Sequence, residues 1–480
     1  MSKLRRRTRR NTDIIRKKAP RAWKLSLERS FLFLLFLLVY AYTVFHFSFL
    51  SESRTVMENA FAFFSLSGIM FLLLYMFLLV VSYRPCIRLQ SQGQLAVFGL
   101  INLCIILTAA ILAGSGKSLF FIPLGLFSCA YAIIYNRWVS AVSTFILCIM
   151  IGLISNWTPE VLIGLLSGAL VAGYYTPQPR RRSRLLKAGL LISMIHISVI
   201  FCFAGLDARL VLRELEIPLL IAGANGIVVG FILANGLFLV EKIFGITTGI
   251  SLLELSDQNQ PALKELVMKA PGTYHHSLLV GNLAETAAES IGANALLARV
   301  ASYYHDIGKT VKPEYFTENM SGQENKHEQL TEAMSALVIT SHVKDGVAIA
   351  GEYGLPRPII DIIRQHHGTS RVEYFYTQAV EKYGSKEVDQ NIFRYPGPRP
   401  RTKEAGIVMI ADSVEAASRS LSDPSASRIR SLIVSIINSK LEDQQFDECA
   451  LSMREISTIR ESLIRGLNSM FHTRVSYNRR

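Results

Sequence analysis

The chain has 480 residues, half of them hydrophobic, and only 18% of them are charged. Since about a quarter of the residues in soluble proteins are charged, this composition argues against a wholly soluble protein and favours a membrane protein. The formal net charge of +14 does not indicate a nucleic-acid partner, because residues 1–29 contribute +10 and residues 30–244 contribute +6, whereas residues 245–480 contribute −2. We attribute the excess of Lys and Arg to the orientation of the chain in the membrane. A lesser alternative is that residues 1–29 contact anionic lipid or RNA.

Residues 1–29 form a basic cytoplasmic tail with little apolar content, and eight apolar runs follow it. Each run is near the length that a helix needs to cross the hydrocarbon core of a bilayer. We therefore predict a membrane domain over residues 30–244 with about eight transmembrane helices, although the short fourth and sixth runs leave the number open by one pair. The runs cover residues 31–50, 61–83, 93–113, 119–135, 138–155, 161–176, 188–206 and 217–240.

The loops between these runs differ in charge, and cytoplasmic loops retain the excess of Lys and Arg. If the N-terminus is inside, the outer loops contain four basic and six acidic residues. An even number of spans leaves residues 245–480 inside as well, and six cysteines without a disulfide framework suit a reducing cytosol. We therefore expect both termini in the cytoplasm. The inner loops carry Arg84, Arg88, Arg137, Arg180, Arg181, Arg182, Arg184 and Lys187.

The rest of the chain is predicted to be helical throughout, after a linker over residues 245–271. Apolar residues recur every three to four positions in most segments of residues 272–480, and no window indicates a strand. Proline and glycine mark helix starts and ends, as at Pro356 and Gly354. The fold class is therefore all-α in both halves. The expected helices cover residues 275–291, 295–305, 327–343, 356–367, 371–383, 403–421, 426–441 and 451–471.

Histidine is concentrated in this second half: seven of the ten histidines lie between residues 275 and 367. A histidine in a helical core usually only needs a hydrogen-bond partner, but seven of them in one domain indicate a metal site. The segment His305-Asp306-Ile307-Gly308-Lys309 adds a carboxylate and a cation. Asp412 lies in an apolar run, where a cation would offset the cost of burying its carboxylate.

These residues suit a site for two divalent metal ions. Asp306 can give one carboxylate oxygen to each ion, as bridging carboxylates do in two-metal sites. We expect His276, His305 and Asp412 to complete the coordination of the first ion. Neighbouring residues on a helix point about 100° apart, so His366 and His367 can share an ion only where their helix ends, just before Gly368. Together with His342, these two histidines would complete the coordination of the second ion.

Several short motifs accompany the candidate ligands. They are Ala270-Pro271-Gly272-Thr273-Tyr274-His275-His276-Ser277, His305-Asp306-Ile307-Gly308-Lys309, His366-His367-Gly368-Thr369, Tyr395-Pro396-Gly397-Pro398 and Ile410-Ala411-Asp412-Ser413-Val414-Glu415-Ala416.

This pattern resembles the HD phosphohydrolase superfamily in its two-metal form, and most closely the bacterial transmembrane HD family that hydrolyses cyclic di-AMP. The resemblance implies a phosphodiesterase of the bacterial cytoplasmic membrane that releases pApA, with iron or manganese as cofactor and Asp306 and Lys309 in catalysis. Lys309 would bind the scissile phosphate, unless it is a solvated surface lysine. Two departures stand out: only about ten residues separate the first two spans, where the family carries a large extracytoplasmic domain, and no GYP triplet follows His367.

Other interpretations remain open at this stage. The substrate could be cyclic di-GMP or another nucleotide, or the domain could bind a nucleotide as a membrane receptor without cleaving it. A transporter is disfavoured because intramembrane charge is scarce. His275 either supports the site without binding metal or lies at the surface, and we do not assign His327 to a metal ion. The segment 395–401 is either a plain extended loop or a lid over substrate phosphates. The sequence does not decide whether the chain forms a homodimer; its expected partners are cyclic di-AMP and the lipid bilayer.

Overall fold

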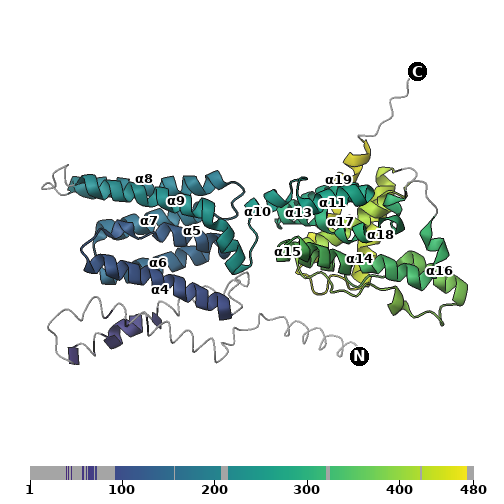
Figure 1. Ribbon diagram of the computed structural model, residues 1–480, viewed down its shortest axis with the longest axis horizontal. Helices are drawn as coiled ribbons and strands as arrows, with labels where there is room; N and C mark the ends of the chain where they lie inside the picture. Colours follow the sequence, from purple (N-terminus) through teal and green to yellow (C-terminus); the bar gives the residue numbers. More distant parts are fainter. Residues whose placement is uncertain are drawn as a thin grey trace, which may run out of the picture. The chain divides into compact units, whose positions relative to one another are not determined.

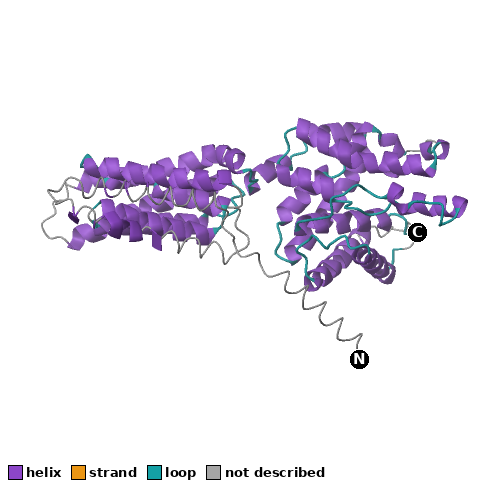
Figure 2. Cartoon of the chain, turned by 90° about the horizontal axis from the view of Figure 1, so that it is seen from below, coloured by secondary structure: helices purple, strands orange, loops and turns teal. Residues whose placement is uncertain are grey.

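The computed structural model describes residues 92–155, 157–206, 215–320, 325–421 and 424–472, together with scattered positions between 39 and 72. These residues are almost entirely helical and contain no strand; one isolated bridge joins Arg371 to Arg394 (Figure 1, Figure 2). The chain divides into two compact units, Met1–Thr248 and Gly249–Arg480. The all-α fold class predicted from the sequence is confirmed.

The first unit consists of apolar helices that match the last six predicted runs to within a few residues. Four of them are long and apolar enough to cross a membrane, and two apolar segments are shorter. The predicted run at 31–50 and most of the run at 61–83 lie outside the described residues, as does the basic tail. The helices are α4 (Gln92–Gly114), α5 (Leu124–Ile134), α6 (Arg137–Ile154), α7 (Pro159–Tyr175), α8 (Arg182–Leu206) and α9 (Glu216–Phe244), with a short 3₁₀ turn, η1 (Leu119–Phe121).

Both faces of these helices are apolar, and this pattern requires lipid around the first unit. On α9, Val229 and Leu233 are buried, whereas Phe231 and Phe238 are 63% and 62% exposed. Large apolar side chains exposed on this scale are rare on soluble proteins. A helix that is hydrophobic all round is stable only when its outer face meets other helices or lipid. The first unit is therefore membrane-associated.

Helices α8 and α9 approach each other closely through small residues. A Cβ atom on Gly226 would lie 2.3 Å from the carbonyl oxygen of Gly189 and 2.5 Å from the amide nitrogen of Ser193. The hydroxyl of Ser193 donates a hydrogen bond of 2.6 Å to the carbonyl oxygen of Gly223. Glycine at such contacts lets two backbones pack closely where no hydrophobic effect drives helix association.

We expect Gly226→Ala to destabilise the first unit by about 1–3 kcal/mol, because the added methyl group meets backbone atoms that cannot rotate away. The matched control is Gly236→Ala on the same helix, where a Cβ atom meets nothing within 4 Å. Thermal denaturation of the detergent-solubilised chain measures both variants. Equal melting temperatures for the two variants would contradict this packing.

The second unit contains every helix predicted for residues 272–480. Three boundaries differ by four residues or more. Helix α12 begins at Pro271 and not at 275, and α14 runs to Glu352 and not to 343. His327 lies in a separate 3₁₀ turn, and α14 begins only at Glu332, where the side chain of Thr331 caps it by accepting a hydrogen bond from the Met334 amide. The helices are α10 (Gly249–Leu255), α11 (Pro261–Lys269), α12 (Pro271–Ser290), α13 (Ala295–Tyr304), α14 (Glu332–Glu352), α15 (Arg357–Gln365), α16 (Glu373–Tyr383), α17 (Lys403–Ser418), α18 (Ala426–Glu442) and α19 (Met453–His472).

Most of the segment predicted as a linker is a folded part of the second unit. Helices α10 and α11 place Leu252, Ala262 and Leu263 in the hydrophobic core, each no more than 2% exposed. Within residues 245–271, the boundary between the two units falls between Thr248 and Gly249. Residues 249–269 are thus tied to the second unit by apolar burial.

Helix α17 lies at the centre of the second unit and packs against α12, α13, α15 and α18. Every residue from Ala405 to Asp412 is buried. A helix surrounded in this way positions its side chains rigidly, so Asp412 and the face of α12 that it meets are held in fixed geometry.

Candidate metal centre

The seven side chains predicted as metal ligands converge from separate helices on one place in the second unit. Helix ends supply most of them: His305 caps the C-terminus of α13, and Asp306 begins the 3₁₀ turn η3 (Ile307–Val311). At the end of α15, Gly368 has φ +54°, which only glycine adopts easily. The remaining ligands are His276 on α12, His342 on α14, His366 and His367 after α15, and Asp412 on α17.

The two carboxylate oxygens of Asp306 face different histidines. Oδ2 lies 3.5 Å from Nε2 of His276 and 3.2 Å from Nε2 of His305. Oδ1 lies 3.2 Å from Nε2 of His342 and 3.6 Å from Nε2 of His366. One carboxylate is therefore shared between two groups of imidazoles, as a bridging ligand would be.

Asp412 also contacts both groups. Its Oδ1 lies 3.1 Å from Nε2 of His276 and 3.8 Å from Nε2 of His305, and its Oδ2 lies 3.6 Å from Nδ1 of His367. Two clusters result, in each of which the candidate ligand atoms lie within 4.8 Å of one another. The first cluster contains His276, His305 and Asp412, and the second contains Asp306, His342, His366 and His367.

Hydrogen bonds to the main chain fix the tautomer of three histidines. Nδ1 of His305, His342 and His366 lies 2.6, 2.6 and 2.7 Å from the carbonyl oxygen three residues earlier. A carbonyl oxygen can only accept, so Nδ1 carries the proton and donates. Nε2 of each ring is left facing Asp306, and metal-bound histidines are held in the same way, with the other ring nitrogen hydrogen-bonded to the protein.

The buried atoms of this site fit a divalent cation. Nε2 of His305 and Oδ1 of Asp306 are both buried without a hydrogen-bond partner. Leaving such atoms unpaired costs about 1–3 kcal/mol each, and a bound cation would satisfy both. The donors are imidazole nitrogen and carboxylate oxygen without thiolate, a set that suits iron, manganese or zinc.

Charge around Asp306 keeps its carboxylate ionised. Burial alone would raise the pKa of Asp306, but the neighbouring His305 and Lys309 outweigh burial and hold this pKa well below its usual value. The ammonium group of Lys309 lies 2.7 Å from Oδ2 of Asp306 and 2.8 Å from Oε1 of Glu318. Its side chain is only 12% exposed, so Lys309 is not a solvated surface lysine.

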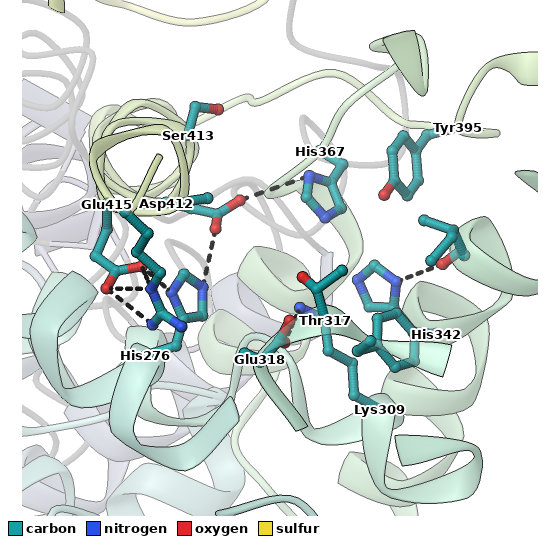
Figure 3. Close-up of a pocket in the computed structure, with 14 residues that line it drawn as sticks. His276, Lys309, Thr317, Glu318, His342, His367, Tyr395, Asp412, Ser413 and Glu415 are labelled. Carbon is teal, nitrogen blue, oxygen red and sulfur yellow. Dashed lines mark hydrogen bonds and ion pairs between the residues drawn. The ribbon is translucent and has the colours of Figure 1, made fainter. Parts of the chain in front are cut away.

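A cavity of about 290 Å³ opens onto these clusters. Lys309 and Glu318 line it on one side (Figure 3). The ring of Tyr395 stacks on that of His367, with centroids 4.2 Å apart. Figure 3 shows the labelled imidazoles and Asp412 gathered around the same space, so a ligand in the cavity would meet both clusters and the ammonium of Lys309.

Glu415 is a member of the site that sequence reasoning missed. It accepts a hydrogen bond from Nδ1 of His276, whose Nε2 faces Asp306, and Arg419 donates to the same carboxylate at 2.8 and 2.9 Å. Glu415 lies three residues after Asp412, on the same face of a buried helix. That spacing was the available signal. Glu318 had no such signal, because it lies in an irregular segment.

We expect Glu415→Gln to weaken metal binding by about 10- to 100-fold, since a carboxylate that orients a ligand histidine typically contributes that much. Glu387→Gln, at an exposed loop position, is the control and should bind metal as the unmodified chain does. Titration with manganese followed by equilibrium dialysis measures both affinities. An unchanged affinity in Glu415→Gln would mean that His276 is held by other contacts.

The remaining candidates lie apart from the clusters. His275 is exposed and belongs to neither cluster. Nε2 of His327 donates a hydrogen bond of 2.8 Å to the carbonyl oxygen of Tyr315. The arginines of segment 394–401 are largely engaged with protein partners: Arg394 pairs with Asp443 at 2.9 Å, and the others contact Thr369 and Glu448. This segment is an extended loop packed beside the site, with Tyr395 at the cavity.

The fold and the site together define a membrane-associated helical protein with a metal-binding domain of the HD type. Residues 273–417 match the family model described as "HD domain", and residues 60–248 match the one described as "7TM receptor with intracellular HD hydrolase". The two matches fall one in each compact unit of the chain. Seven of the eight predicted apolar runs lie within residues 60–248, and the run at 31–50 precedes them.

The chain is similar to two proteins named cyclic-di-AMP phosphodiesterase PgpH. It is 43% identical to that of Bacillus subtilis over 320 residues, which are 66% of this chain and 44% of the relative. It is 44% identical to that of Listeria monocytogenes over 298 residues, 62% of this chain and 41% of the relative. The chain thus spans less than half the length of these curated relatives.

The HD domain of the Listeria monocytogenes protein, solved in complex with cyclic-di-AMP, is 49% identical. The comparison covers 45% of this chain and 100% of that structure, with a TM-score of 0.43.

Proposed function

We propose that this chain is a metal-dependent phosphodiesterase that hydrolyses cyclic di-AMP to pApA at the cytoplasmic face of the bacterial inner membrane. The observation that carries the proposal is the Asp306 carboxylate, whose two oxygens face two separate groups of buried imidazoles. Cyclic di-AMP is the substrate in the names of the two relatives. The absence of a GYP triplet after His366-His367 disfavours cyclic di-GMP.

The ligand clusters would hold two divalent ions, for which we propose iron or manganese. His276, His305 and Asp412 would bind the first ion, His342, His366 and His367 the second, and Asp306 both. Ions held in this way lower the pKa of a bound water molecule and neutralise charge on phosphate oxygens.

Lys309 would contact the scissile phosphate. An ammonium group has three N–H donors, and two of them are directed at Asp306 and Glu318. Its third donor is available to a phosphate oxygen in the cavity. Burial would lower the pKa of Lys309, but the carboxylates of Asp306 and Glu318 raise it above its usual value, so the group stays charged. Glu318 thus holds Lys309 beside Asp306, and Glu415 orients His276.

We also propose that both termini are cytoplasmic, from the distribution of Lys and Arg in the loops. A reporter of membrane side fused after Lys187 should be active on the cytoplasmic side, and the same reporter fused after Asp207 should be active outside. Fusions that report the same side at both positions would contradict this topology.

Hydrolysis by the purified full chain tests the proposed function. The chain is purified in detergent without oxygen and loaded with manganese or with iron, and cyclic di-AMP and cyclic di-GMP are supplied separately. Conversion of cyclic di-AMP to pApA, faster than any conversion of cyclic di-GMP, is the expected result. Preferential cleavage of cyclic di-GMP would change the substrate, and binding without turnover under either metal would make the protein a nucleotide receptor.

A further inference from the structure

A second cavity, of about 580 Å³, adjoins the metal centre. Ser413, the residue after Asp412, lines both cavities. Arg394 lines the second cavity, and its neighbour Tyr395 lines the first. The two cavities therefore border the same two short chain segments.

A cation with few partners lies in this second cavity. Lys440, near the C-terminus of α18, donates a hydrogen bond of 2.8 Å from Nζ to the hydroxyl of Ser370. Among the described residues, no carboxylate lies within ion-pair distance of its ammonium group. Burial lowers the pKa of Lys440, and the carboxylates of Asp412 and Asp443, which favour the charged form, offset burial only in part. Two of its three N–H donors remain for a ligand.

Further hydroxyl groups line the same cavity. Ser435 and Ser439 lie one turn apart on α18 and line the cavity together with Lys440 and Ser413. A cation combined with several hydroxyl donors is the chemistry that recognises a phosphate group, since phosphate oxygens accept many hydrogen bonds.

The other charged groups of the cavity are mostly engaged with one another. Arg371 contacts both carboxylate oxygens of Glu373, at 2.7 and 2.8 Å. Arg394 contacts both carboxylate oxygens of Asp443, at 2.9 and 3.1 Å. Lys440 is therefore the lining cation whose charge is least neutralised by a direct partner, although Glu442 also lines the cavity.

We propose that this cavity is a second phosphate site, in which Lys440 and the surrounding serine hydroxyls bind the phosphate group of a dinucleotide that is not at the metal clusters. The inference rests on the proposed function, because a cyclic dinucleotide carries two phosphates and only one of them can lie beside Asp306. Lys440 would then favour two-phosphate substrates over simple phosphodiesters, which need only the metal centre.

The test compares Lys440→Met with the unmodified full chain, loaded with manganese, on two substrates. We expect the KM for cyclic di-AMP to rise by about 10- to 100-fold, the effect of losing a charge-assisted hydrogen bond. Hydrolysis of bis(p-nitrophenyl) phosphate, which has a single phosphate, and the bound metal content should not change. Lys440→Arg, which keeps the charge, should recover part of the affinity. Lys386→Met, at an exposed position, is the matched control.

Two results would overturn the inference. A parallel loss with both substrates would mean that Lys440 supports Asp412 and the metal centre, and an unchanged KM for cyclic di-AMP would mean that it binds no phosphate. If the unmodified chain binds cyclic di-AMP without cleaving it, the proposed function fails separately. Calorimetric affinity for cyclic di-AMP then decides the inference: weaker binding by Lys440→Met supports it, and equal or absent binding in both chains refutes it.

Discussion

Asp306→Asn is expected to remove metal from both clusters and to lower phosphodiesterase activity by at least about 100-fold. The substitution keeps the size of the side chain but replaces the negative charge that faces imidazoles on both sides. Each cluster loses the oxygen that it shares with the other, so both ions should be lost together. Metal content by plasma mass spectrometry, measured beside hydrolysis of cyclic di-AMP, reads out the two effects.

The control for this change is Asp361→Asn, which makes the same chemical substitution on α15. The Asp361 side chain is 40% exposed and lies 3.8 Å from Arg357, so metal content and activity should match those of the unmodified chain. Circular dichroism checks that the Asp306→Asn variant is folded. If this variant is folded and still holds two ions per chain, Asp306 is not the shared ligand.

Gly308→Ala is expected to destabilise the second unit strongly and to disturb the metal centre with it. A Cβ atom at position 308 would lie 1.9 Å from the carbonyl oxygen of His342 and 2.4 Å from the amide nitrogen of Gly346. Both are backbone atoms of α14, so no side-chain rotation can relieve the clash. Either η3 or α14 must move, and a candidate ligand lies on α14 and another directly before η3.

The expected loss is about 3 kcal/mol or more, at the upper end for overpacking, which lowers the melting temperature of a unit of this size by roughly 6–12 °C. Thermal unfolding followed by circular dichroism measures it. Gly351→Ala, on the same helix α14 with nothing within 4 Å of the added Cβ atom, should be neutral or stabilising by up to about 1 kcal/mol. A melting temperature for Gly308→Ala equal to that of this control would show that η3 and α14 do not meet as described.

Much of this protein could be predicted from its sequence, because the relevant signals are local. The helices of residues 272–480 follow from apolar spacing, and their ends follow from capping residues and glycines, which act within a few positions. The apolar helices of the first unit follow from length and composition alone. The candidate ligands were found by residue type, since clustered histidines and a carboxylate in an apolar run are unusual wherever they occur.

Tertiary structure alone decided how these residues meet. His276 and Asp412 are 136 positions apart, and no local pattern states which oxygen of Asp306 faces which imidazole. The pairing of Lys309 with Glu318, the placement of Lys440 beside Ser370 and the close approach of Gly308 to α14 all depend on which helix faces pack together. Periodicity identifies the buried face of a helix, but the neighbour of that face is chosen by packing of the whole core.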